Sequence, residues 1–319
     1  MNILITGACG LLGSHITAAL ARNHNVVGID RHPWWGDQPV NMLLGELGAP
    51  GFIREAINAV APDILIHCAA LANVDACEQD PSRAYICNAD ITRDLARAVS
   101  PDCLVVYITT DGIFMGDTSF ATEESLPCPR TVYGRSKLHG EWNVKQAANN
   151  HLIIRTNFYG WSSGRKQTSA EWLYHALETG ETITLFDDFF FTPIYVVDFV
   201  VRLELLIEGG HRGIFHLCGK ERISKYQFGS WMAEAAGLSM RSVRRGSIND
   251  VPLFAPRPKD MSLSSERFRR LSGVDVPGCT AGLQRFLADR ERPLSERFDG
   301  LQDNLPQAAD LVKAARASK

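Results

Sequence analysis

The chain opens with a short apolar segment, Asn2–Thr6, that leads straight into a glycine-rich loop. Gly7, Gly10 and Gly13 form a GxxGxxG spacing, and a helical pattern starts where the loop ends. Such glycines permit a tight turn and a close approach of the backbone to a pyrophosphate, which the N–H groups at the start of a helix attract. Strand, loop and helix in this order predict a dinucleotide-binding α/β fold, with an ordinary glycine-rich connection as the alternative.

An acidic residue lies at the distance from this loop that a dinucleotide site requires. Asp30 follows the second apolar run, Asn25–Ile29, where a carboxylate can accept hydrogen bonds from the adenosine ribose hydroxyls. It would repel a 2′-phosphate, whereas Arg31 could bind one. NAD(H) is therefore the expected cofactor and NADP(H) stays open, with a solvated strand-end carboxylate as the alternative reading of Asp30.

The first half of the chain alternates short apolar runs with helical stretches. Further strands are expected at Ile64–Cys68, Leu104–Thr109 and His151–Arg155. The helical stretches are Gly13–Arg22, Gly51–Val60, Ser82–Val99 and Tyr133–Ala148. This alternation predicts a doubly wound parallel sheet of the Rossmann type, covered by helices on both faces.

After Gly160 the alternation fades, which predicts a smaller C-terminal substrate lobe. A length of 319 residues also suits two lobes better than one. Strong apolar runs return further along, so the chain is expected to re-enter the large lobe before finishing in the small one. The predicted segments are a dinucleotide-binding domain at 1–160, lobe at 161–191, return at 192–218, lobe at 219–291, and a polar tail at 292–319 that forms a loosely attached surface helix.

Composition excludes several classes of partner. A formal charge of −3 and a pI near 6.3 provide no general attraction to nucleic acid or to an anionic membrane. No apolar run is long enough to cross a bilayer, and the N-terminus does not resemble a secretion signal. The eight cysteines lack metal-ligand spacing and are expected to be reduced thiols, so we predict a cytoplasmic protein without a metal. A homodimer is compatible with the sequence.

Tyr133 and Lys137 form a YxxxK motif within a helical stretch. The i, i+4 spacing puts both side chains on one helix face, where an ammonium can lower the pKa of the phenol and prepare it for proton transfer. A surface Tyr–Lys pair is the alternative, since the motif is common in helices. Upstream, an apolar strand ends in Thr109 and Thr110, and open α/β sheets bind ligands at such carboxyl ends. Hydroxyl, phenol and ammonium together predict a proton-donating group beside a nicotinamide.

These motifs together resemble an extended short-chain dehydrogenase/reductase, specifically the dTDP-4-dehydrorhamnose reductase family. The resemblance covers roughly residues 1–270, judged from motif order. The segments that carry it are GACGLLG at 7–13, HCAALANVDACEQDP at 67–81 with Asn88, TTDGIF at 109–114, YGRSKLHGE at 133–141, RTNFYG at 155–160, TPIYVVD at 192–198 and RP at 257–258.

The resemblance implies a role for each matching position. Thr110 would be the catalytic hydroxyl, with Thr109 as second choice, Tyr133 the proton donor, and Lys137 the residue that tunes the phenol and binds the ribose. The implied cofactor-binding residues are Gly7, Gly10, Leu11, Leu12, Gly13, Asp30, Arg31, Glu46, Leu47, Ala69, Ala70, Leu71, Asn88, Thr109, Tyr133 and Lys137. The implied substrate-binding residues are Asn73, Val74, Asp75, Thr110, Asn157, Phe158 and Arg257.

Two of these assignments have structural alternatives. Residues 69–75 could be only a strand end and a loop with an Asx turn. Arg257, in a Pro-Arg-Pro loop, resembles an arginine that binds a nucleotide diphosphate, but a solvated loop arginine is equally compatible.

The function implied is an NAD(P)H-dependent reductase that acts on the 4-keto group of a nucleotide-linked 6-deoxyhexose. Two alternatives stay open. A nucleotide-sugar epimerase or dehydratase would use the same first half and regenerate its cofactor in each cycle. A non-catalytic regulatory subunit like the methionine adenosyltransferase β-subunit would share the fold and bind a partner enzyme.

Overall fold

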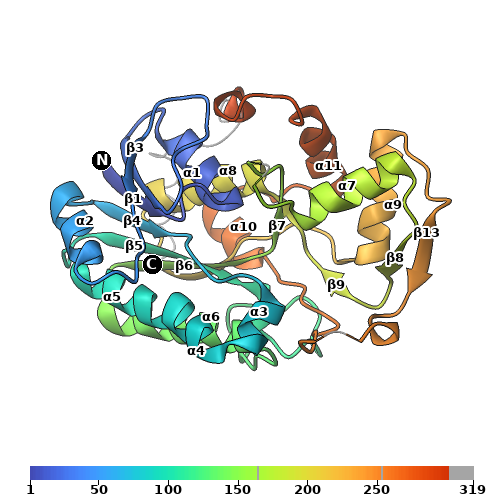
Figure 1. Ribbon diagram of the computed structural model, residues 1–319, viewed down its shortest axis with the longest axis horizontal. Coiled ribbons are helices and arrows are strands. Elements are labelled where there is room, and N and C mark those ends of the chain that lie inside the picture. Colours follow the sequence, from blue (N-terminus) through green and yellow to red (C-terminus); the bar gives the residue numbers. More distant parts are fainter. Residues whose placement is uncertain (164, 253, 302–319) are drawn as a thin grey trace.

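A computed structural model describes residues 1–163, 165–252 and 254–301, and within them seven strands form one sheet (Figure 1). Every neighbouring pair in this sheet is parallel, and the order is β11-β6-β5-β4-β1-β2-β3. The strands are β1 (Asn2–Thr6), β2 (Asn25–Asp30), β3 (Asn41–Leu44), β4 (Ile64–His67), β5 (Leu104–Thr110), β6 (His151–Thr156) and β11 (Gly213–His216). The predicted doubly wound sheet is confirmed.

Helices cover both faces of the sheet, which is why its central strands are apolar throughout. Successive residues of β1 point to opposite faces: Ile3 and Ile5 pack with one hydrophobic cluster, and Leu4 with the other. The first cluster includes α1 (Leu11–Leu20) and α8 (Val196–Glu208). The second includes α2 (Phe52–Val60), α5 (Ile91–Ala98) and α6 (Val132–Ala147), and the two groups lie on opposite sides of the sheet in Figure 1.

The strand order reverses direction at β1, whose two neighbours are β2 and β4. A crevice opens outside the carboxyl ends of parallel strands at such a switch point, and ligands of open α/β folds bind there. The glycine-rich loop follows β1 directly, so the fold brings it to this crevice.

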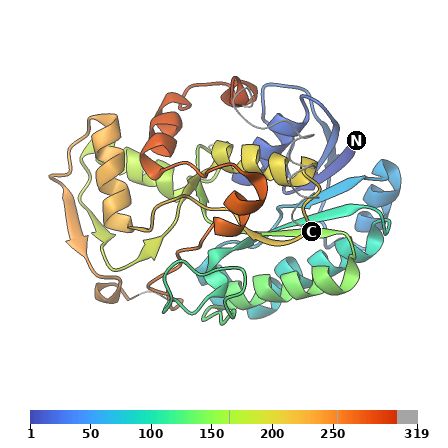
Figure 2. The ribbon, with the colours of Figure 1, turned by 180° about the vertical axis from the view of Figure 1, so that it is seen from behind.

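The small lobe lies beyond the carboxyl ends of β1, β4 and β5, at the opposite end of the molecule from β3 (Figures 1 and 2). Among its described residues it contains three two-stranded sheets, namely β7 with β10, β9 with β12 and β8 with β13. Their bounds are β7 (Phe158–Tyr159), β8 (Ile183–Phe186), β9 (Phe190–Phe191), β10 (Ile194–Tyr195), β12 (Ile223–Ser224) and β13 (Val243–Gly246). The remaining longer helices are α7 (Ser169–Thr179), α9 (Lys225–Ala236), α10 (Glu266–Ser272) and α11 (Cys279–Ala288).

Between these lobes the chain crosses more than once. Strand β11 pairs with β6 in the large sheet, although β12 and α9 follow it directly in the small lobe. The boundaries of the predicted segments stay a prediction.

Three local features differ from what the sequence indicated. Strand β3 was not expected, because its four residues lie at the sheet edge and lack a buried apolar pattern. The expected helix at 82–99 is α4 (Pro81–Tyr85), a π-helical turn (Ile86–Asp90) and α5, and the extra residue of that turn has no sequence signal. Helix α3 (Val74–Gln79), capped by Asn73, begins within the segment for which a loop with an Asx turn was the alternative.

The start of the predicted tail is not a loosely attached surface helix. Leu294 and Phe298 are 3% exposed and belong to the main core cluster, and Phe298 ends a 3₁₀ turn, Ser295–Phe298. The rest of the tail, 302–319, lies outside the described residues. Within the described residues, no helix has the length and apolar character needed to cross a membrane.

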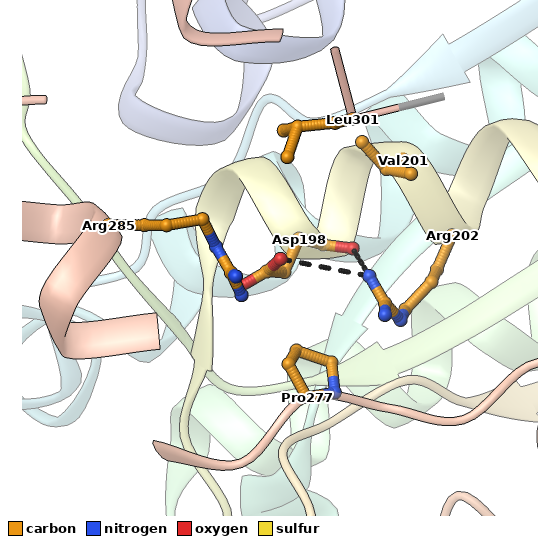
Figure 3. A pocket seen from close by; sticks show the side chains of 6 residues that line it. All are labelled: Asp198, Val201, Arg202, Pro277, Arg285 and Leu301. Carbon is orange, nitrogen blue, oxygen red and sulfur yellow. Dashed lines mark hydrogen bonds and ion pairs between the residues drawn. The ribbon is translucent and has the colours of Figure 1, made fainter. Parts of the chain in front are cut away.

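A buried carboxylate joins α11 to the large lobe. Asp198 of α8 lies between the guanidinium groups of Arg202 and Arg285, and Arg285 comes from α11 (Figure 3). Arg202 also donates two hydrogen bonds to the carbonyl of Asp275. The small hollow that these side chains line with Pro277 and Leu301 is therefore bordered by charges that already have protein partners.

Candidate active site

The glycine loop brings the start of α1 close to the end of β1. Gly7 has a φ of +68°, which favours glycine, and a Cβ on Gly13 would lie 2.1 Å from the Gly7 carbonyl oxygen. A Cβ on Gly10 would meet only that oxygen, at 3.3 Å. No side chain caps α1, whose first turn contains Leu11 and Leu12. Its N–H groups are therefore available to an anion.

The adenosine end of the expected cofactor site lies beyond β2 and β3. Asp30 accepts hydrogen bonds from the N–H groups of Cys9 (3.0 Å) and His32 (3.1 Å), one on each carboxylate oxygen. The guanidinium of Arg31 lies 3.5 Å from the Glu46 carboxylate, and both side chains are exposed. Leu47, next in the chain, packs against the α2–α5–α6 cluster.

The loop after β4 is held by one buried amide. Asn88 accepts a hydrogen bond from the Leu71 N–H (2.8 Å), and its amide group donates to the Leu71 carbonyl and to Ser136 of α6. Asn88 has no exposed surface, so it does not make the direct contact with the cofactor crevice that was expected from the sequence. It positions the loop, in which Ala70 is exposed and Ala69 is partly exposed.

Helix α6 starts directly against the turn that follows β5. Thr131 caps the helix by accepting the Gly134 N–H (2.9 Å), and a Cβ on Gly134 would lie 2.3 Å from the Gly112 carbonyl oxygen. This close approach places Tyr133 beside Thr110. A fully buried ion pair between Glu141 of α6 and Arg155 of β6 (2.8 Å) holds the helix on the sheet.

Lys137 lies one turn further along α6 and is almost fully buried. Its ammonium donates to the Ile108 carbonyl (2.8 Å) and lies 4.1 Å from the centre of the Tyr107 ring. Burial lowers the pKa of Lys137 to about 7, against the opposing effect of Glu141.

The expected lowering of the Tyr133 pKa by Lys137 does not occur. Burial raises the pKa of the Tyr133 phenol above its usual value, and a hydrogen bond with the Thr110 hydroxyl opposes this shift. The Lys137 ammonium donates its hydrogen bond to the Ile108 carbonyl. A phenol with a raised pKa keeps its proton and can donate it.

Two charged residues of the site were not expected from the sequence. Asp111 accepts hydrogen bonds from the Thr110 hydroxyl (3.0 Å) and the Asn157 amide (2.6 Å), and burial raises its pKa to about 6. Burial lowers the pKa of Lys225 to about 8, while the Asp111 carboxylate opposes this shift. Lys225 begins α9 in the other lobe, and only the packing of the two lobes brings it here, so no spacing in the sequence could have indicated it.

A pocket of about 360 Å³ adjoins these groups. Its polar lining includes Asn157, Lys225 and Arg257. Its aromatic lining includes Phe158, Trp172, Phe186, Phe189, Phe191 and Phe228. Three of the substrate-binding candidates, Asn157, Phe158 and Arg257, thus line one pocket.

Asp75 approaches this pocket from the large lobe. Its carboxylate accepts hydrogen bonds from the Ala255 N–H (3.2 Å) and the Arg257 guanidinium (2.9 Å), so Arg257 is paired and not a solvated loop arginine. Asn73 accepts the Ala76 N–H and caps α3, and Val74 is the first residue of that helix. The 73–75 segment therefore positions the Arg257 loop.

The crevice fits a nicotinamide dinucleotide. The start of α1 is uncapped, Gly10 presents no side chain, and Asp30 keeps a free lone pair on each oxygen for ribose hydroxyls. Thr109, at the end of β5, has a buried hydroxyl oxygen without a hydrogen-bond partner in the part of the chain that the structure describes. Buried polar atoms of this kind are normally satisfied, and a polar group of a bound cofactor would supply a partner.

Fold and site together define an NAD(P)-dependent oxidoreductase of the extended short-chain dehydrogenase/reductase type. The model of the RmlD substrate binding domain family matches residues 1–292, and the chain belongs to this family.

Three comparisons describe its relatives. A probable low-salt glycan biosynthesis reductase, Agl14, from Haloferax volcanii is 32% identical over 289 residues, which cover 87% of this chain and 94% of the relative. The solved dTDP-4-dehydrorhamnose reductase of Bacillus anthracis in complex with NADP is 28% identical, with a TM-score of 0.81 over 90% of this chain and 98% of that one. Methionine adenosyltransferase 2 subunit beta from Rattus norvegicus is 28% identical and covers 91% of this chain and 89% of the relative.

Proposed function

We propose that this protein is an NAD(P)H-dependent reductase of the 4-keto group of a nucleotide-linked 6-deoxyhexose. The observation that carries the proposal is that Tyr133 lies beside the Thr110 hydroxyl, while Lys137, one turn further along α6, binds the same strand at the Ile108 carbonyl. The printed function of the B. anthracis neighbour, a dTDP-4-dehydrorhamnose reductase, supports this substrate class.

The residues of this chain supply the proton and hold the ketone. The bound reduced nicotinamide supplies hydride to the carbonyl carbon. The Tyr133 phenol, which keeps its proton because its pKa is raised, gives that proton to the carbonyl oxygen as the C–O double bond becomes single. The Thr110 hydroxyl, whose one hydrogen is donated to Asp111 in this structure, would turn to donate to the same oxygen. The Lys137 ammonium would stabilise the phenolate that remains and bind the ribose, and a proton from solvent would then restore the phenol.

For the cofactor we propose a preference for NADH over NADPH. Asp30 would bring a negative charge next to a 2′-phosphate, and Arg31, the nearby cation, already lies beside Glu46. The neighbour solved with NADP favours the opposite preference. A cytoplasmic location and a homodimer stay predictions.

A panel of 4-keto nucleotide sugars, incubated separately with NADH and NADPH, tests the proposal. We expect one reduced nicotinamide to be consumed for each sugar reduced. Conversion of sugar without net consumption of cofactor would instead indicate an epimerase or dehydratase. If no sugar is converted and the protein binds methionine adenosyltransferase in a pull-down, the regulatory-subunit alternative replaces the proposal.

A further inference from the structure

Lys225 is a cation in the aromatic pocket that the proposed chemistry does not use. Its backbone N–H donates to the Phe189 carbonyl (3.1 Å), and Ser224 before it caps α9. These bonds fix the start of α9 at the pocket that Lys225 lines, and the ammonium lies 3.5 Å from the centre of the Phe191 ring. The position of the charge is therefore set by the backbone, not by an acidic partner.

Among the described residues, no oxygen accepts a hydrogen bond from the Lys225 ammonium, and no carboxylate forms a salt bridge with it. Asp111 acts on it only as a nearby charge, because both Asp111 oxygens are already bonded to Thr110 and Asn157. An ammonium has three donors, and placing it among phenylalanine rings without acceptors costs free energy. A ligand in the pocket would supply the missing acceptors.

The charge of the pocket identifies the chemistry of that ligand. Its lining contains two cations, Lys225 and Arg257, and no acidic residue among those described. Asp187 and Asp188, which lie between the lining residues Phe186 and Phe189 in the chain, have other partners: Asp187 binds Ser224 and Arg245, and Asp188 binds Lys259. Two positive charges beside aromatic rings match a group with two negative charges attached to a planar base.

We propose that Lys225 binds the diphosphate of the substrate's nucleoside diphosphate group and, together with Arg257, makes this pocket selective for a diphosphate over a monophosphate or an uncharged nucleoside. Asp75 already accepts a hydrogen bond from the Arg257 guanidinium, which leaves Arg257 fewer donors for a ligand. Arg257 alone would therefore leave one of the two phosphate charges without a partner, and Lys225 supplies it. This inference deepens the proposed function by assigning a recognition role to a residue of the small lobe.

Binding measurements on Lys225→Gln, Lys225→Arg and the wild type test the proposal without turnover. The probes are the diphosphates of thymidine, uridine, guanosine and cytidine, followed by the monophosphate and nucleoside of whichever binds most tightly. We expect Lys225→Gln to weaken diphosphate binding by roughly 10- to 100-fold, the usual worth of a hydrogen bond to a charged group, and the nucleoside by much less. Lys225→Arg should keep most of the affinity, and NADH binding should not change.

Lys220→Gln is the matched control, since Lys220 is an exposed lysine that pairs with Asp275 and does not line the pocket. Thermal melting of each variant reports whether it folds. If Lys225→Gln does not fold, the comparison of Lys225→Arg with the wild type still tests the proposal. Equal diphosphate affinity in Lys225→Gln and wild type, an equal loss for nucleoside and diphosphate, or no diphosphate binding by the wild type would each overturn the proposal. A drop in kcat with unchanged KM would mean that Lys225 acts through Asp111 instead. Because binding is measured directly, failure of the reductase assay leaves this result interpretable.

Discussion

The site has a cofactor half, formed by the glycine loop, Asp30 and the loop after β4, and a substrate half, formed by the aromatic pocket. The two halves are built in different ways. In the cofactor half the polar groups are largely backbone groups, or side chains already bonded to backbone, such as Asp30 and Asn88. In the substrate half the polar groups are side chains that come together from distant parts of the sequence. One of them, Lys225, has ammonium hydrogens that no described residue accepts.

The difference shows which half is free to vary. A surface of backbone N–H groups and glycines recognises a feature common to all dinucleotides, so few substitutions are compatible with it. A pocket lined by side chains can change its charge and shape by single substitutions without altering the fold. We therefore expect cofactor binding and substrate binding to respond to different sets of variants.

Tyr133→Phe is expected to have the largest effect, because Tyr133 lies where the halves meet and contributes to chemistry more than to binding. Removal of the hydroxyl should lower turnover by on the order of 10² to 10⁴, the usual worth of positioned acid catalysis. Steady-state oxidation of reduced nicotinamide measures this. Binding of NADH and of a nucleoside diphosphate should change little, and near-normal turnover would remove Tyr133 from the mechanism.

Two glycines separate ligand recognition from folding inside the cofactor half. Gly10→Val should weaken NADH binding by roughly 10- to 100-fold, because its side chain would occupy the open space above α1. Gly13→Val should instead lower stability by about 3 kcal/mol, since its Cβ would overlap the Gly7 carbonyl. NADH titration and thermal melting of both variants distinguish the effects. Unchanged NADH affinity in Gly10→Val, with lost stability, would indicate a purely structural glycine.

The smallest effect is expected at Asp30, which is only partly buried. Asp30→Ala should shift the ratio of kcat/KM values toward NADPH by about tenfold, because it removes the repulsion of a 2′-phosphate that solvent and salt already screen. Adding Arg31→Ala should reverse part of the shift. If the wild type prefers NADPH, or if Asp30→Ala leaves the ratio unchanged, Asp30 does not discriminate between the cofactors. Binding of nucleoside diphosphates should be the same in all three proteins.

Local sequence was enough to predict the strand, the glycine loop and the helix of the cofactor half. The GxxGxxG spacing needs only a strand, a tight turn and a helix, and the 3.6-residue period of a helix puts Tyr133 and Lys137 on one face. Burial was harder to foresee: Lys137 was expected to lower the phenol pKa, but the desolvation of both side chains has the larger effect.

The substrate half depends on contacts that no local pattern encodes. Arg257 meets Asp75 across 182 residues, and Lys225 reaches Asp111 because α9 begins where β12 pairs with β9. The sequence by itself determined the alternating strands and helices, the dinucleotide loop and the Tyr–Lys pair, since each depends on bonds between near neighbours in the chain. Only the tertiary structure decided the charge of the pocket, because that charge is the sum of side chains that packing of the small lobe brings together.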